Sequence, residues 1–165
     1  RGERRSNATL ASTTDPDARL FRKSRGTGAI LCFMGHTLME NRNGLIVQAE
    51  LTHADGHAER RAALGMIHRH SPGSTRRLTL GADKGYDSDW FREALTDLEI
   101  TPCIPGRANR KAPIPYDADL YKQRNRIERM FGRLKDWRRI ATRYDRCAHT
   151  FMSAICIAAT VIFWL

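Results

Sequence analysis

Apolar and polar positions along this chain fall into segments that predict short strands and amphipathic helices. Two apolar runs, at 29–39 and 45–52, flank the polar stretch Glu40–Gly44. Its Asn-Gly pair favours a turn, because both residue types tolerate positive φ. We therefore predict an antiparallel hairpin. Residues 59–70 have helical periodicity, and Ser-Pro-Gly at 71–73 is expected to end that helix.

The second half of the chain continues this alternation. In chain order it predicts a strand at 78–82, a helix with Asp87 or Ser88 as its N-cap, a strand at 100–104, a long helix from Asp117 to about Ile140 and an apolar helix at 149–165. This order of elements indicates an α/β fold with one mixed sheet. We expect a hairpin at one edge of the sheet and parallel strands joined by crossover helices elsewhere.

Composition and charge add the size of the domain and a class of partner. The chain has 165 residues, 41% of them hydrophobic, which is enough for one domain with a core. We expect a flexible basic arm at 1–28 and a domain at 29–165. Lys and Arg number 28 against 18 Asp and Glu, so the formal net charge is +10. Arginine supplies most of the excess, which favours phosphate groups as partners.

Cysteine usage and the apolar runs exclude several other classes. The four Cys residues stand far apart with no Cys-x-x-Cys pair, which argues against a zinc ribbon or a disulfide scaffold and fits a cytoplasmic protein. The apolar run 154–165 is about half of the ~20 residues that a membrane-spanning helix needs. We therefore expect no membrane partner and a buried terminal helix.

The predicted long helix carries a narrow polar row. At about 100° per residue, Tyr121, Arg124, Glu128 and Lys135 fall within an arc of about 60°, beside an apolar stripe. A carboxylate in this row would be partly buried among cations. The pattern also fits a surface row held by an Arg124–Glu128 ion pair, and the helix alone does not decide between the two.

Asp83 favours the first interpretation. It ends a predicted strand and precedes Gly85, which is where open α/β sheets place ligands and catalytic groups. An Asp at a strand end and a Glu on a packing helix offer the oxygen ligands that Mg²⁺ prefers. Two such ions can clamp the attacking and leaving oxygens of a phosphodiester displacement.

Taken together, these motifs resemble a known family. Tyr121-x2-Arg124-x3-Glu128-x6-Lys135 is similar to the signature around the last catalytic Glu of the DDE transposases of bacterial insertion sequences. The segment 83–87, Asp-Lys-Gly-Tyr-Asp, resembles the family's segment around its second catalytic Asp. His36 and the stretch 38–45 resemble the hairpin between the first two acidic residues.

The resemblance implies a ribonuclease-H-like fold and an enzyme that cuts and joins DNA at the ends of an insertion sequence. It implies that Asp83 and Glu128 are catalytic metal ligands for Mg²⁺ or Mn²⁺, with two ions in the intact enzyme. DNA contacts are then expected from the row residues and from the loop 107–111: Tyr121, Arg124, Lys135, Arg107, Arg110 and Lys111. The expected partners are transposon ends and target DNA, bound by a homo-oligomer.

One family feature is missing from the pattern. The first catalytic Asp belongs on an opening strand, but no strand bearing an Asp is predicted ahead of Ala29, and Asp15 and Asp17 lie in a polar, Pro-containing stretch. The chain begins at Arg1 and its first Met is Met34, so we expect a fragment that is inactive by itself. The alternatives are a non-catalytic DNA-binding remnant or transposon regulator, a ribonuclease-H-like nuclease of another family, and an RNA-binding protein.

Overall fold

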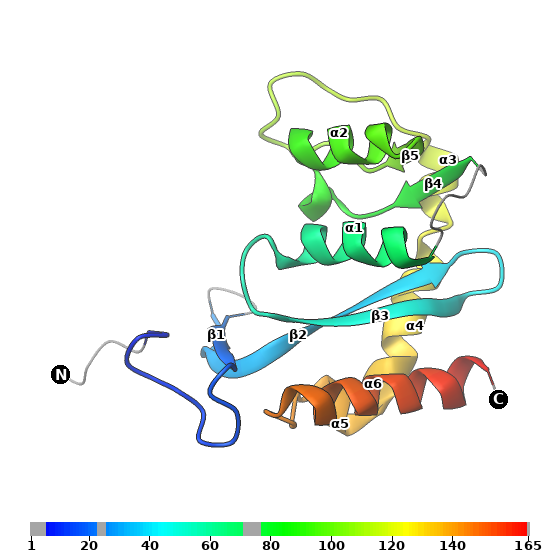
Figure 1. Cartoon of the computed structure of the whole chain (residues 1–165). Coiled ribbons are helices and arrows are strands. Elements are labelled where there is room, and N and C mark those ends of the chain that lie inside the picture. The colour runs from blue at the N-terminus through cyan, green and yellow to red at the C-terminus, as the bar shows by residue number, and fades with distance from the viewer. Residues whose placement is uncertain (1–5, 23–25, 71–76, 165) are drawn as a thin grey trace.

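The computed structural model describes residues 6–22, 26–70 and 77–164 of the chain. Its elements, in chain order, are β1 (Arg19–Phe21), β2 (Ile30–Glu40), β3 (Leu45–His53), α1 (Ala58–His70), β4 (Leu78–Gly81), the 3-10 turn η1 (Lys84–Tyr86), α2 (Asp89–Asp97), β5 (Ile100–Cys103), α3 (Ala118–Lys122), α4 (Asn125–Asp136), α5 (Arg138–Ala141) and α6 (Ala148–Phe163) (Figure 1). The α/β class and most of the predicted elements are confirmed. The helix-ending signal at 71–73 lies outside the described residues.

The predicted hairpin is formed by β2 and β3, which pair antiparallel from Phe33↔His53 to Glu40↔Leu45. Of the Asn-Gly pair only Gly44 takes a positive φ, 77°. The Glu40 carboxylate instead shapes the loop, because it accepts the backbone N–H groups of Arg42 at 2.5 Å and Asn43 at 2.8 Å. The connection is therefore a longer loop that closes on one glycine.

The expectation of one mixed sheet is wrong. The described strands form two sheets, β1-β2-β3 and the parallel pair β4-β5. In the described residues, β2 pairs with β3 over Phe33–Glu40, and β4 pairs with β5. The two sheets share side-chain packing rather than backbone hydrogen bonds. Leu38 of β2 packs into the core cluster that also takes Leu78 and Leu80 of β4.

Helices cover both faces of the hairpin. Figure 1 shows β2 and β3 between α1 on one side and α6 on the other, with α2, β4 and β5 beyond α1. Alternation along β2 explains this arrangement, because successive side chains of a strand point to opposite faces. Phe33 packs against Phe151 and Ile155 of α6, whereas Leu38 packs toward α1 and β4.

The long helix predicted over 117–140 is divided into α3, α4 and α5. At the first break Arg124 N–H donates to Tyr121 O, which is the tighter i→i+3 pattern. At the second break Trp137 is extended, with ψ 102°, so α5 changes direction. No Pro marks either position in the sequence. The first break lies beside a tertiary contact, in which Gln123 accepts from Asn41 of the hairpin loop at 3.2 Å.

Part of the segment expected as an arm is ordered against the domain. A short strand precedes Ala29, because β1 pairs with the start of β2, but its sequence Arg-Leu-Phe contains no Asp. The expectation that no strand bearing an Asp precedes Ala29 therefore holds for the described residues. Asp15 accepts the backbone N–H of Ala148 at 3.0 Å and so caps α6. The boundary at residue 28 stays a prediction, although β1 pairs across it. Within the described residues no helix combines the length and hydropathy needed to cross a membrane.

Candidate active site

Asp83 lies where the sequence predicts it, just beyond the carboxyl end of β4. It is exposed and caps the turn η1, since its Oδ1 accepts the N–H of Gly85 at 2.7 Å. A Cβ on residue 85 would lie 2.7 Å from that same oxygen. A side chain at residue 85 would therefore displace the Asp83 carboxylate from this position, which gives the Asp-x-Gly spacing a structural reason.

Two guanidinium groups converge on the same turn. The carbonyl oxygen of Gly85 accepts from Arg60 Nη1 at 2.7 Å and from Arg107 Nη2 at 2.8 Å. Arg107 also donates from Nε to the carbonyl oxygen of Lys84 at 3.2 Å. Arg60 comes from α1 and Arg107 from the loop after β5. The turn that carries Asp83 is therefore held from two sides.

Asp87, at the end of the turn, is the centre of a buried charge network. Its Oδ1 accepts from Arg92 Nε at 2.8 Å and lies 3.6 Å from Arg110 Nη1, and its Oδ2 accepts the Arg107 N–H at 2.8 Å. The Asp87 side chain is 0% exposed. Burial alone would raise the pKa of Asp87, but the Arg107 amide and the Arg92 guanidinium outweigh it and hold the pKa below its ordinary value.

Asp87 thereby ties three segments together, because Arg92 also donates to the carbonyl oxygen of Ile104 at 2.7 Å. Of the two cap residues that the sequence offers, Ser88 occupies the N-cap position of α2, although its side chain makes no cap bond. Asp87 is instead a structural anchor of the site. Between these polar groups Tyr86 is partly buried, and its burial, with Glu59 and Asp83 nearby, raises its pKa.

Glu128 and its neighbours on α3 and α4 form a chain of contacts among themselves. Arg124 Nη2 donates to Glu128 Oε1 at 2.6 Å, and the Arg124 guanidinium lies 5.3 Å from the centre of the Tyr121 ring. The side chain of Glu128 is 60% exposed and that of Arg124 22%. The intrahelical ion pair is thus formed, and it leaves the Glu128 carboxylate open to solvent.

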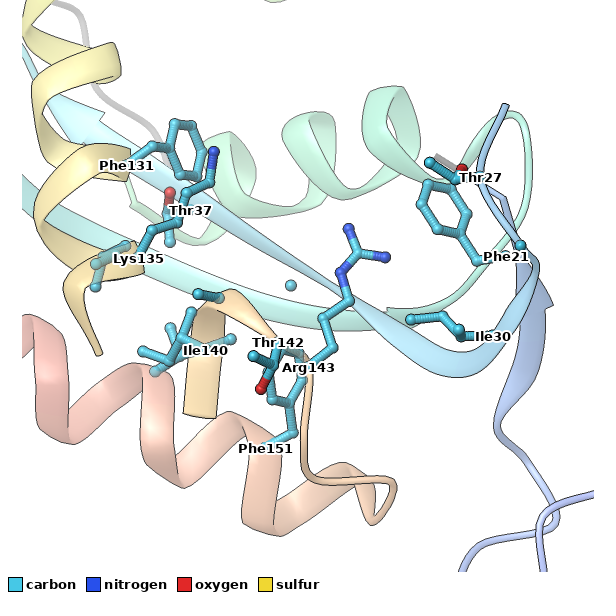
Figure 2. Close-up of a pocket in the computed structure, with 15 residues that line it drawn as sticks. Phe21, Thr27, Ile30, Thr37, Phe131, Lys135, Ile140, Thr142, Arg143 and Phe151 are labelled. Atoms are coloured by element: carbon cyan, nitrogen blue, oxygen red, sulfur yellow. The ribbon is translucent and has the colours of Figure 1, made fainter. Parts of the chain in front are cut away.

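Lys135, the last residue of the signature, lies away from that pair. Its Nζ is 6.0 Å from the centre of the Phe131 ring, and it lines a pocket of about 290 Å³ between β2 and α4–α6. Figure 2 shows Phe131 and Lys135 of α4 on one side of this pocket and Phe21 and Ile30 on the other. The break between α3 and α4 also means that an uninterrupted helical wheel does not describe the row.

The loop residues expected to bind DNA differ in their surroundings. The guanidinium of Arg107 is bound to the turn, and that of Arg110 pairs with Asp87 and with exposed Asp89. Lys111 is exposed. The internal partners of Arg107 and Arg110 indicate a structural role, so the DNA contact expected of them stays a prediction.

The candidate metal ligands offer hard oxygen donors, which suit Mg²⁺ or Mn²⁺. Asp83 and Glu128 are both exposed carboxylates. In the described part of the chain, however, no group of three or more His, Cys, Asp or Glu side chains is placed to hold an ion. Asp15 caps α6, and Asp17 lies 3.9 Å from Arg19. Neither therefore joins the two candidate ligands, and the site fits a metal only in part.

Sequence reasoning missed Arg60, which is 9% exposed and holds the turn from α1. A signal was present in the sequence. Arg60 stands three residues before Ala63 and seven before Ile67, so it shares the helix face that these buried residues present to the core. A charged residue on an apolar helix face indicates a buried polar contact.

Comparisons with known proteins bear on the same part of the chain. Residues 80–165 match a family described as "Transposase DDE domain". A protein of Brucella ovis named "Putative transposase for insertion sequence element IS6501" is 36% identical over 85 residues, which is 51% of this chain and 65% of that protein. The chain therefore spans slightly less than two thirds of the relative's length. The family match begins within β4 and takes in Asp83 and Glu128.

Proposed function

The chain belongs to the transposase DDE domain family, and from this membership we propose that it is part of the catalytic domain of a DNA transposase. The reaction is metal-dependent phosphodiester cleavage followed by strand transfer at the ends of an insertion sequence. The observation that carries the proposal is the position of Asp83, an exposed carboxylate fixed at the carboxyl end of β4 inside the matched region.

Asp83 and Glu128 are the proposed metal ligands. The family generally uses divalent metal ions, and Mg²⁺ or Mn²⁺, two in the intact enzyme, would lower the cost of charge build-up on the phosphate oxygens. Arg124 orients the Glu128 carboxylate through its 2.6 Å bond and stacks on Tyr121. Arg124 and Tyr121 would thus position the Glu128 carboxylate and would not themselves react with DNA.

The proposed partner of the chain is DNA, both at the transposon ends and at the target. The protein would bind it as a homo-oligomer in the cytoplasm. The net charge of +10 supports an electrostatic contribution from the phosphate backbone. The proposed DNA contacts are Tyr121, Arg124, Lys135 and Lys111. Arg107 and Arg110, which lie close to the turn after Asp83, are the other candidates. Binding by such contacts weakens steeply as salt rises and reads little sequence.

The proposal includes a missing ligand. A ribonuclease-H-like sheet would be continuous, whereas β2 and β4 lie in separate sheets here. In the described residues β4 pairs only with β5, and beyond its start, where β1 pairs with it, β2 pairs only with β3. A further strand carrying the first catalytic Asp would fit between them. Because two carboxylates hold two ions poorly, the chain is expected to be inactive by itself.

The alternative is a non-catalytic DNA-binding remnant or regulator with the same fold. The described residues contain no cluster of three or more metal-ligating side chains, and this favours the alternative. A cleavage assay decides between the two. DNA from the ends of the element that encodes the chain is incubated with Mg²⁺ or Mn²⁺ and either this chain or a version extended upstream. Glu128→Gln is the test variant, and Glu93→Gln, which alters an exposed Glu of α2, is the matched control.

Transposase chemistry predicts that only the extended form cuts, that Glu128→Gln abolishes cutting and that Glu93→Gln does not. If the extended form binds these ends but never cuts them, the chain is a binding remnant. If the short chain cuts, the argument for a missing ligand fails.

A further inference from the structure

We propose that Arg60 and Arg107 are positioning residues that fix the orientation of Asp83 by holding the Gly85 peptide between them. The inference rests on the proposed function, because the orientation of Asp83 matters for catalysis only if Asp83 binds a metal ion. It assigns Arg107 a role other than the DNA contact expected from the sequence. It also adds Arg60, which lies outside the family match at 80–165.

The first step is the geometry at Gly85. A carbonyl oxygen has two lone pairs, and here each accepts a guanidinium N–H, at 2.7 Å from Arg60 and 2.8 Å from Arg107. Hydrogen bonds from charged donors are stronger than neutral ones. The N–H of the same residue donates to Asp83 Oδ1 at 2.7 Å. A rotation of the backbone at Gly85 would therefore disturb both the bonds to its carbonyl oxygen and the bond from its N–H to Asp83. By fixing the carbonyl group, the two arginines restrain the Asp83 carboxylate.

The second step concerns the burial of Arg60. The residue is 9% exposed, and among the described residues it makes no salt bridge. Its Nη2 donates to the carbonyl oxygen of Gly56 at 3.2 Å, and its Nε is buried without a partner. Burying a guanidinium without a carboxylate is destabilising. The hydrogen bonds from Arg60 to the carbonyl oxygens of Gly85 and Gly56 offset this cost, and the shorter of them holds the turn.

The third step is the support of Arg107. Its backbone N–H is bound to Asp87, which is itself bound to Arg92 of α2. Its side chain reaches back to the carbonyl oxygens of Lys84 and Gly85. Backbone and side chain of Arg107 thus hold the two ends of the same turn. With Arg60 they connect the turn to α1, α2 and the loop after β5, which is how a rigid site is built on packed elements.

Amide hydrogen exchange of the full chain, followed by NMR, tests the grip directly. Arg60→Gln and Arg107→Gln are the test variants. Arg61→Gln is the matched control, because Arg61 adjoins Arg60 on α1 but is 63% exposed and pairs with Asp55. The amides at 85–87 are expected to exchange about tenfold faster or more in each test variant, while those inside α1 and α2 keep their wild-type rates. Arg60→Lys, which keeps one donor, is expected to fall between.

Unchanged exchange at 85–87, or faster exchange spread evenly over the molecule, would overturn the inference. If Arg60→Gln does not fold, by far-UV circular dichroism, Arg107→Gln alone decides. A second measurement uses Mn²⁺ as the probe, with free Mn²⁺ followed by electron paramagnetic resonance. Loss of either arginine is expected to weaken Mn²⁺ binding about tenfold, as removal of outer-shell partners does elsewhere.

Asp83→Asn separates this inference from the proposed function. If Asp83→Asn leaves Mn²⁺ binding unchanged, the metal role proposed for Asp83 fails, and hydrogen exchange alone decides whether the two arginines hold the turn. If Asp83→Asn weakens binding but the arginine variants do not, the proposed function stands and the positioning role is wrong.

Discussion

Asp87→Asn is expected to destabilise the fold strongly even though the substitution changes almost no volume. The carboxylate is fully buried and binds Arg92 at 2.8 Å, and the Arg92 side chain is only 10% exposed. Asparagine can still accept the Arg107 N–H, so that bond, about 1 kcal/mol, is retained. The lost charge leaves a buried guanidinium unpaired, and removing one partner of a buried ion pair typically costs about 3–5 kcal/mol.

We expect a loss of about 3 kcal/mol, the low end of that range, because Arg110 keeps a second partner in Asp89. For a chain of this size each kcal/mol lowers Tm by about 2–4 °C, so Tm should fall by about 6–12 °C. Urea unfolding at pH 7, followed by tryptophan fluorescence, measures the change in free energy. The matched control is Asp89→Asn, whose side chain is 75% exposed and pairs with the same Arg110.

The control should lose at most about 1 kcal/mol, as exposed ion pairs do. If Asp87→Asn costs no more than Asp89→Asn, the reasoning about the buried network is refuted. The dependence of stability on pH provides an independent check of the role of Asp87. The pKa of Asp87 is held below its ordinary value, so its contribution is complete above about pH 3.9 and is lost as the pH falls through the lower, folded-state value. The difference between wild type and Asp87→Asn should therefore shrink in strong acid.

Four further substitutions test other parts of the fold by the same unfolding assay. Gly35→Ala should destabilise by about 1–3 kcal/mol, because a Cβ would lie 2.6 Å from an α6 side chain. Gly132→Ala, in open space on α4, should instead stabilise by up to about 1 kcal/mol. Equal effects of the two substitutions would contradict the close packing of Gly35 against α6. Burial lowers the pKa of His36, although Glu50 and Asp55 oppose the effect. The unfolded chain therefore takes up the proton first, and wild type should lose stability relative to His36→Gln as the pH falls below about 6.5; parallel pH profiles would exclude this. Asp15→Ala should cost about 1 kcal/mol by uncapping α6, and a variant as stable as wild type would show that the cap contributes nothing.

Local patterns in the sequence determined most of the elements of this protein. The spacing of apolar residues predicts the hairpin, α1, α2, β4, β5 and α6 to within a few residues, because these periodicities follow directly from strand and helix geometry. The position of Asp83 at a strand end could be predicted for the same reason. The Tyr-Arg-Glu-Lys spacing and the Asp-Lys-Gly-Tyr-Asp segment resemble the family that the matched region confirms.

Tertiary structure alone decided the features that depend on residues distant in the chain. The break at Gln123 and Arg124 lies beside a hairpin loop some 82 positions earlier, and the cap of α6 comes from Asp15, 133 positions away. The grip of Arg60 on Gly85 and the burial of Asp87 likewise join separate elements. No local periodicity encodes such contacts, since they form only when packing brings the elements together. The sequence therefore determines which residues can carry the chemistry, and the packing of α1, α2 and the turn determines how Asp83 is held.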